Sequence, residues 1–505
     1  MLTVKQHVRA SEFAVAAAIV SICFQLILFK IGPTTLLYQA VLMCVVVLST
    51  AALGDERGRF DIRQPWAVLM VFHIPFWIVG TLNTIFEKGQ GSDWTFERVG
   101  QIPSALLIIS TGFLFIGMGY RMGLKVYANR TRHDKPYPWD CSRLVPLTIA
   151  IYALAWLVRY SHGESLQAAT FSMLLEQSPL PAYVRALSGP IPMFLILIVW
   201  GAHYSNPDRR DIFRLALVVT VGELIWAVII GTSKSLFVLP IFLPMIPYII
   251  FNRSIPLRRL ALSVGVLIFL AYPYASALRE VYFILDGPTR SVARELAFQQ
   301  SSLWSTFNSE LIGNYATQAM ERSGGIGALN QLLQLDEQGR LNIRGEFYWR
   351  AVVGLIPRFL WADKPILLEG VYFSAYLQGW TGNISDIDPA AISGSVAPTL
   401  FGSFFWNLGW PGVVLTSFVL GFFSGRVFSY LKRRNNLADP ASFLYYVSIL
   451  SLLDTTESEV VKFPSSLVWS IAVAWVIIRA LGWHKKPLWQ TGANGHCRTG
   501  SHPVS

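Results

Sequence analysis

Apolar stretches long enough to cross a lipid bilayer recur along almost the whole chain. A transmembrane helix needs about 20 mostly apolar residues to span a hydrocarbon core about 30 Å thick. Twelve stretches are candidates, and the two that begin at 186 and 441 are short enough to be half-spans. The twelve are residues 12–29, 34–53, 65–85, 102–120, 144–160, 186–201, 213–230, 234–251, 259–275, 409–428, 441–455 and 462–480. The sequence therefore predicts an all-α fold, a polytopic transmembrane helical bundle of about 12 spans with one large extracytoplasmic loop.

Composition and charge placement argue against a soluble protein. Of the 505 residues, 53% are hydrophobic and 14% are charged, whereas soluble domains carry about 25% charged residues. A net charge of +11 can indicate nucleic-acid binding. Here the Lys and Arg residues cluster between the apolar stretches, and no basic stripe alternates with aromatic residues for base stacking. We therefore expect no nucleic acid among the partners.

The four cysteines and the N-terminal segment give no sign of a metal site or of a cleaved leader. The cysteine spacing matches no zinc or haem pattern, so we expect no metal and no cofactor. Lys5 and Arg9 precede the apolar stretch from Phe13 to Phe29, as in a secretory signal. Because no convincing cleavage site follows, we interpret this stretch as an uncleaved first helix.

The distribution of Lys and Arg predicts how the chain is oriented, because cytoplasmic loops carry an excess of both. With a cytoplasmic N-terminus, 25 of the 41 basic residues fall in cytoplasmic segments and seven in short segments on the other side. This distribution favours cytoplasmic N- and C-termini. The predicted units are a transmembrane bundle of about nine spans (1–275), a large extracytoplasmic loop (276–395), a re-entrant element with the last three spans (396–481), and a cytoplasmic tail (482–505).

The loop at 276–395 is long enough to fold by itself. Loops beyond about 15 residues are usually functional or disordered. Its aromatic residues argue against disorder, among them Trp304, Tyr348, Trp349, Trp361 and Trp380. We expect a helix from Thr289 to Ala319 and, after the glycine-rich segment at 323–327, a second, amphipathic stretch.

Basic side chains are dense in this loop, against the general rule that they stay on the cytoplasmic side. Guanidinium groups bind phosphate oxygens in pairs, so a lipid pyrophosphate is one ligand that this cluster fits. The alternative is that the cations pair with lipid headgroups or with Glu346 and Asp363. The cluster consists of Arg344, Arg350, Arg358 and Lys364.

A second candidate anion site is the segment Gly231-Thr-Ser-Lys-Ser235, at the predicted start of the eighth span. Free backbone N–H groups and the positive end of the dipole make a helix N-terminus attractive to anions. Ser233, Lys234 and Ser235 would reinforce such a site. The alternative is a capped turn without a ligand.

Two further pairs are predicted to lie at the extracytoplasmic mouth of one cavity. Arg279 and Glu280 follow the ninth span directly, and Arg159 and His162 close the fifth span on the same side. His162 is a candidate base, because an imidazole has an ordinary pKa near 6.5. The alternative is an interfacial histidine beside an arginine.

Glu223 is an acid well inside a predicted span. The cost of burying a carboxylate at that depth must be offset by a partner, which makes the residue a functional candidate. Lys234 is one possible partner. The alternatives are a structural ion pair or a protonated acid that bonds to a neighbouring helix.

The segment at 393–412 is apolar, rich in small residues, and broken by Pro398 and Pro411. This pattern indicates a re-entrant or interfacial element that leads into the tenth span, and irregular backbone at such depth is tolerated where it lines a cavity. Ser403 and Asn407 could face that cavity, although small residues also serve helix packing.

These features together resemble the bacterial O-antigen and capsule repeat-unit polymerases, the Wzy-type membrane glycosyltransferases. The resemblance covers about residues 215–430 and rests on Ile356-Pro-Arg358 with Trp361-Ala-Asp-Lys-Pro365, on Gly231-Thr-Ser-Lys-Ser235, and on Phe401-Gly-Ser-Phe-Phe-Trp-Asn-Leu-Gly409. It implies a metal-independent enzyme of the bacterial cytoplasmic (inner) membrane. Such an enzyme polymerises polyprenyl-pyrophosphate-linked repeat units, for example on undecaprenyl pyrophosphate, into O-antigen, capsule or exopolysaccharide. A chain-length regulator and a flippase are possible protein partners, beside membrane lipid.

In such an enzyme the basic cluster would neutralise the pyrophosphate leaving group. The residues that would do so are Arg279, Arg344, Arg358 and Lys364. A carboxylate or imidazole would accept the proton of the acceptor hydroxyl, and the sequence leaves this role open among Glu223, Asp363, Glu280 and His162.

Two other functions remain open at this stage. A transporter or flippase of lipid-linked saccharides would bind the same pyrophosphate, but it should carry paired interrupted helices in two related halves. An O-antigen ligase would transfer finished glycan to lipid A, and His162 keeps this reading open.

Overall fold

The computed structural model describes residues 63–66, 101–125, 141–162, 190–230, 239–252, 325–340, 345–356, 369–388, 398–434, 439–450 and 462–481, and isolated positions between them. In this part of the chain all regular structure is helical and no strand occurs. The predicted all-α class is therefore confirmed for the described residues. The helix expected at 289–319 and the tail at 482–505 lie outside them.

The described helices are α4 (Ile102–Lys125), α5 (Leu144–Ser161), α8 (Pro190–Ser205), α9 (Arg210–Ile230), α11 (Met245–Asn252), α17 (Gly325–Glu337), α18 (Glu346–Gly354), α19 (Glu369–Leu377), α20 (Leu400–Arg434), α21 (Pro440–Leu450) and α22 (Lys462–Ala480). Most of them lie on predicted spans, and α17 lies on the predicted amphipathic stretch of the loop, whereas α18 and α19 were not predicted. Among the described residues, four helical segments are long and apolar enough to cross a membrane, namely Pro103–Lys125, Leu144–Ser161, Arg210–Ile229 and Leu400–Leu431. The predicted spans at 12–29, 34–53, 65–85 and 259–275 lie almost entirely outside the described residues.

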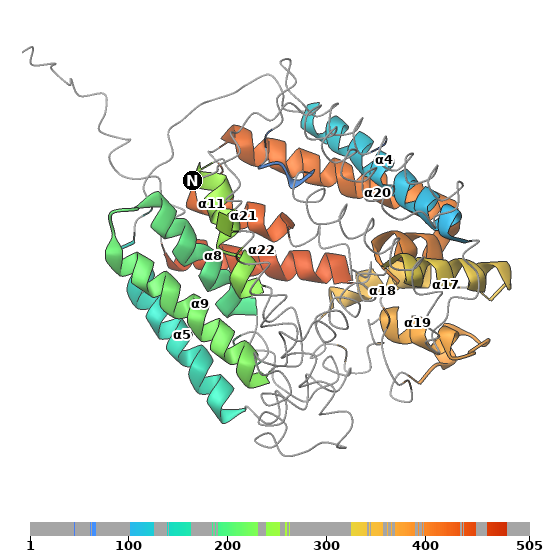
Figure 1. Cartoon of the computed structure of the whole chain (residues 1–505), viewed down its shortest axis with the longest axis horizontal. Helices are drawn as coiled ribbons and strands as arrows, with labels where there is room; N and C mark the ends of the chain where they lie inside the picture. Colours follow the sequence, from blue (N-terminus) through green and yellow to red (C-terminus); the bar gives the residue numbers. More distant parts are fainter. Residues whose placement is uncertain are drawn as a thin grey trace, which may run out of the picture.

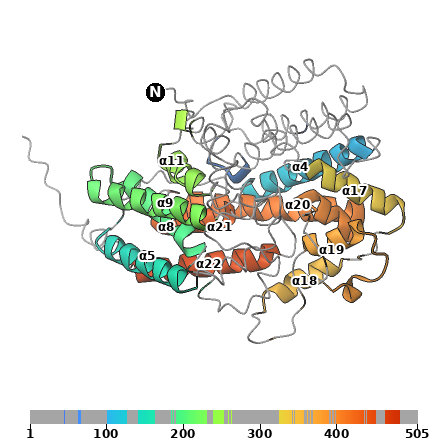
Figure 2. The ribbon, with the colours of Figure 1, turned by 60° about the horizontal axis from the view of Figure 1, so that its bottom comes forward.

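The helices form two packed groups with a cap of shorter helices at one end (Figure 1). Helices α4 and α20 lie side by side, and α5, α8 and α9 form a second group. The short helices α17, α18 and α19 gather at one end of α20, as the second view also shows (Figure 2). The segment predicted as a separate loop unit therefore packs directly on membrane-spanning helices.

Glycines allow α4 and α20 to pack backbone against backbone. Each helix carries a Gly-x-x-x-Gly motif, Gly119 with Gly123 in α4 and Gly421 with Gly425 in α20. A β-carbon on Gly421 would lie 2.1 Å from the carbonyl oxygen of Ile116, which leaves no room for a side chain. Such pairs of small residues are a common way to bring membrane helices into close contact.

The register of this contact shows that α4 and α20 run in the same direction. Later residues of one helix meet later residues of the other, in the pairs Ile116 with Gly421, Tyr120 with Gly425, and Leu124 with Ser429. Successive predicted spans cross the membrane in opposite directions, so the fourth and tenth spans should run in the same direction, as α4 and α20 do.

The segments predicted to face the cytoplasm contact one another. The ring of Trp139 lies 5.4 Å from that of Phe443 and 5.9 Å from that of Phe251. The hydroxyl of Tyr446 donates a hydrogen bond to the carbonyl oxygen of Arg63. Four chain segments that are far apart in the sequence therefore meet at one end of the bundle.

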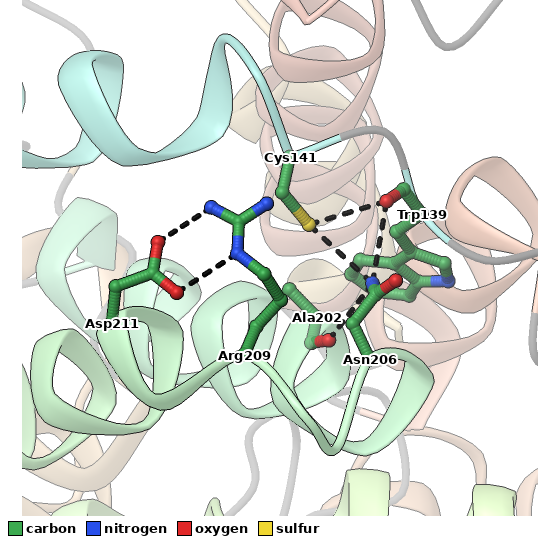
Figure 3. A network of polar contacts seen from close by, with 6 residues as sticks. All are labelled: Trp139, Cys141, Ala202, Asn206, Arg209 and Asp211. Atoms are coloured by element: carbon green, nitrogen blue, oxygen red, sulfur yellow. Dashed lines mark hydrogen bonds and ion pairs between the residues drawn. The ribbon is translucent and has the colours of Figure 1, made fainter.

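A polar network fixes the turn between α8 and α9 at the same end (Figure 3). The side-chain amide of Asn206 donates hydrogen bonds to the carbonyl oxygens of Ala202, at 3.2 Å, and Trp139, at 3.3 Å. The thiol of Cys141 donates to the same Trp139 oxygen at 3.2 Å. The start of α5 is thereby tied to the α8–α9 turn.

Helix α20 is interrupted at Gly409, where φ is 62° and ψ is −147°. This backbone conformation is open essentially to glycine alone. Pro411 follows, at the start of the second half of the helix, and Gly409 is the residue at which the tenth span was predicted to begin. The preceding residues, 400–408, form a short, largely buried helix inside the segment 393–412, and the re-entrant or interfacial character predicted for that segment stays a prediction.

We predict that Gly421→Leu disrupts the α4–α20 contact, because its side chain would collide with the backbone of α4. Overpacking of this kind typically costs about 1–3 kcal/mol and can cost more. The matched control is Val419→Leu, since Val419 lies on the same helix and is 62% exposed. Thermal unfolding of the purified proteins in detergent should show a lower midpoint for the first variant. Equal midpoints would contradict the close packing.

Candidate functional site

A fully buried ion pair joins α5 and α9. Arg159 lies in the last turn of α5, and Glu223 lies about two turns before the end of α9. Nη1 of Arg159 is 2.7 Å from Oε1 of Glu223, and Nη2 is 2.8 Å from Oε2. Both side chains are 0% exposed. The guanidinium and the carboxylate therefore meet as two parallel charge-assisted hydrogen bonds, the strongest geometry for such a pair.

Aromatic rings enclose this pair. The guanidinium carbon of Arg159 lies 4.6 Å from the ring centroid of Trp226 and 5.7 Å from that of Trp156. The hydroxyl of Tyr152 donates a 3.2 Å hydrogen bond to the carbonyl oxygen of Val219 in α9. The rings exclude water, and the cation gains from their negative faces.

The structure gives Glu223 a different partner from the Lys234 considered in the sequence. It also places Arg159 inside the packed α5–α9 contact, whereas the sequence placed it at a cavity mouth. Linear spacing could not reveal this pairing, because it depends on which faces of α5 and α9 meet. The alternative of a structural ion pair matches the geometry. Glu223 could act as a base only if the pair opened.

His162 ends α5, one turn beyond the ion pair. Its backbone N–H donates to the carbonyl oxygen of Val158 at 3.0 Å. Its ring Nδ1 lies 2.8 Å from the hydroxyl of Ser161, and the residue is half-buried. The imidazole is therefore held at the end of the helix, close in the chain to Arg159.

A second group of buried polar residues lies where α18, α19 and the first part of α20 meet. We call it the α20 polar cluster, and it consists of the buried residues Arg350, Glu369, Ser403 and Asn407 together with Glu346, whose side chain is 37% exposed. The hydroxyl of Ser403 donates to the carboxylate of Glu369, which is 0% exposed. The side-chain oxygen of Asn407 accepts the backbone N–H of Phe347 at 3.1 Å. One turn of α20 thereby binds both α18 and α19.

Arg350 supplies the positive charge of this cluster. Its Nε lies 3.1 Å from Oε1 of Glu346, one turn earlier in α18. Its guanidinium carbon is 4.5 Å from the ring centroid of Tyr372, in α19. Burial raises the pKa of the neighbouring Tyr348 phenol, its hydrogen bond with Thr416 opposes this shift, and the charge of Glu369 adds to it. The cluster thus combines a buried cation and a buried carboxylate within one packed unit.

Glu369 is the residue that the sequence analysis missed. Its signal is modest, because an acid at the first turn of an apolar helix is also a common capping choice. Ser403 and Asn407 were expected either to line a cavity or to serve helix packing. In the structure both serve packing through hydrogen bonds, since both are buried against α18 and α19.

Most of the other predicted site residues lie outside the described residues. They are Ser233, Lys234, Ser235, Arg279, Arg344, Arg358, Asp363 and Lys364. Their predicted roles stay predictions. Among the residues that the structure describes, no group of three or more His, Cys, Asp or Glu side chains could hold a metal ion.

Comparison of the chain with models of protein families, with characterised proteins and with solved structures finds no match. The fold itself defines a class. Within the part of the chain that the structure describes, four apolar helices of membrane-crossing length and two groups of charged side chains buried among helices are the features of an α-helical membrane protein.

We predict that Glu223→Gln destabilises the protein strongly, because it leaves the Arg159 cation unpaired in a dry site. Breaking one side of a buried pair costs about 3–5 kcal/mol. The double variant Arg159→Leu with Glu223→Leu removes both charges and should unfold at a higher temperature than the single variant. A matched control is Asp211→Asn, which breaks the exposed pair with Arg209 and should change the midpoint little. A double variant no more stable than Glu223→Gln would show that the two charges are not coupled.

Proposed function

We propose that the protein polymerises polyprenyl-pyrophosphate-linked oligosaccharide repeat units into a surface polysaccharide. The observation that carries this proposal is the folded unit of α17, α18 and α19, which packs against membrane-spanning helices around buried charges. A glycan polymerase needs such a unit beside the membrane, because its two substrates carry long polar chains on lipid anchors. The unit lies at the end of α4 and α20 that is opposite the end carrying Lys125 and Arg426.

Charge placement supports the same proposal. Helix α4 has 24 residues and is therefore about 36 Å long, which separates the two ends by a membrane thickness. The basic segments that contact one another at the far end would face the cytoplasm under the positive-inside rule. The unit of α17–α19 would then face the side on which lipid-linked glycans are polymerised, in a bacterial cytoplasmic membrane.

The proposed reaction is a glycosyl transfer. A hydroxyl of the acceptor sugar attacks the anomeric carbon of the donor glycan, and the bond from that carbon to the pyrophosphate oxygen breaks. Arg279, Arg344, Arg358 and Lys364 would stabilise the charge that develops on the leaving pyrophosphate. The proton of the hydroxyl would pass to a carboxylate or imidazole.

The base in this scheme is open among several groups. Asp363, Glu280 and His162 remain proposals from the sequence. Glu223 competes less well, since Arg159 occupies both of its carboxylate oxygens. Glu369 is a further carboxylate in the folded unit, although it is fully buried as the structure stands.

A flippase of lipid-linked saccharides is the second candidate. The break at Gly409 favours it, because transporters use interrupted helices at their binding sites. A flippase would move lipid-linked repeat units across a vesicle membrane without lengthening the glycan. The polymerase should lengthen it in the absence of any other protein.

We predict that Arg358→Ala lowers the yield of lengthened glycan by about 10²-fold or more, because one stabilising donor to the leaving group is lost. The assay incubates purified protein in nanodiscs with lipid-linked repeat units isolated from cells that lack this protein, and the products are resolved on a gel. Arg209→Ala is the matched control, since it removes the same charge from an exposed position in the turn between α8 and α9. Normal ladders from Arg358→Ala would reject its catalytic role, and no lengthening by the unaltered protein would favour the flippase.

A further inference from the structure

Helix α18 has the opposite distribution of polar and apolar side chains to a helix on the surface of a soluble protein. Its inner face buries the charged side chain of Arg350 together with Phe347. Its outer face is apolar, and the apolar surface continues into the turn that follows Gly354. We call this surface the α18 stripe, which consists of Trp349 and Val352, one turn apart on the helix, and of Leu355 and Ile356 in that turn. These four side chains are 62%, 55%, 45% and 38% exposed. Water is an unfavourable solvent for such a face.

The position of α18 along α20 shows at what depth this face lies. The hydroxyl of Tyr348 is hydrogen-bonded to the side chain of Thr416, which lies about two turns beyond the break at Gly409. Helix α18 also packs against α22. The short helix therefore lies beside the membrane-spanning part of α20 and does not stand above it.

The apolar surface continues from α18 onto α20. A β-carbon on Gly345, at the start of α18, would lie 3.5 Å from the side chain of Leu408. Leu408 and Trp410 are 47% and 41% exposed, and Val419, further along α20, is 62% exposed. On a helix that crosses a membrane, exposed apolar side chains of this kind face lipid.

We propose that α18 lies in the membrane interface and that its stripe contacts the acyl chains of phospholipids just below their headgroups. Trp349 has the chemistry for this depth, because tryptophan is enriched where the apolar core meets the headgroups. Amphipathic helices that lie in the membrane plane bury their apolar face to this level. The lipid contact then sets the depth of Arg350 and, through Phe347 and Asn407, of the α20 polar cluster.

This proposal adds a consequence to the proposed function, but it does not depend on that function. If the protein acts on lipid-linked glycans, a lipid-anchored helix keeps the folded unit of α17–α19 at the height of the pyrophosphate group. The substrate could then reach the unit without leaving the bilayer. The contact itself can be measured on a protein that shows no activity.

The test compares the access of lipid-soluble oxygen and of a water-soluble nickel chelate to spin labels on the full chain in phospholipid nanodiscs. Labels are attached to single cysteines introduced as Trp349→Cys and Val352→Cys in a background without the native cysteines. Val419→Cys serves as the lipid reference, and Gln338→Cys, at an exposed polar position after α17, serves as the water reference. We expect both α18 labels to favour oxygen over nickel severalfold, as the lipid reference does.

Two outcomes would overturn the proposal. Labels on α18 that favour nickel, as at position 338, would place the stripe in water. Labels that neither reagent reaches would show that protein covers the stripe, either another segment of the chain or a second copy.

A second measurement keeps the native cysteines. The emission of Trp349 is the difference in fluorescence between the unaltered protein and Trp349→Phe. Phospholipids brominated near the headgroup end of the acyl chain should quench this emission at least twofold more than acrylamide in water does. Stronger quenching by acrylamide would equally reject the lipid contact. A failure of glycan lengthening with intact lipid contact would reject the proposed function alone.

Discussion

The close contact between α4 and α20 is the constraint on which the described structure depends. Gly421 and Gly119 bring two backbones together where a β-carbon would collide with the opposite carbonyl. In a bilayer, lipid is as apolar as the helix surface, so close packing takes over the role that the hydrophobic effect has in water. At one end this helix pair carries α17 to α19, and near the other end the ring of Tyr120 in α4 lies 6.4 Å from that of Trp66.

Buried charge is the second organising feature, and it is managed in two different ways. Arg159 and Glu223 neutralise each other through two short hydrogen bonds among aromatic rings, and the pair connects α5 to α9. In the α20 polar cluster, Arg350 is shared between Glu346 and the ring of Tyr372, while Glu369 is held by Ser403. In the first pair, the guanidinium of Arg159 and the carboxylate of Glu223 bind each other through both carboxylate oxygens. The second cluster joins α18 and α19, of the unit that we propose handles the glycan, to α20.

The spans were predictable because their signal is local. The helices at 102–125, 144–161, 210–230 and 462–480 begin and end close to the predicted residues, since hydropathy and helix length are properties of consecutive residues. The break at Gly409 falls at the predicted start of the tenth span, within a segment whose prolines, Pro398 and Pro411, predicted an interruption. The partner of Glu223 was not predictable, and neither was the burial of Glu369, because both depend on how helices are rotated against each other.

The sequence by itself indicated that the helices of this protein are surrounded by lipid, and it determined their helical class and the positions of the described spans. It also showed that basic residues are crowded in one long segment. Tertiary structure alone decided that Arg159 faces Glu223 across 64 residues of chain, that Arg350 turns inward, and that Trp349 turns outward. The reason is physical. A span is specified by the transfer free energy of its own residues, whereas an ion pair or an exposed stripe is specified by the axial and rotational register of separate helices, which no single segment encodes.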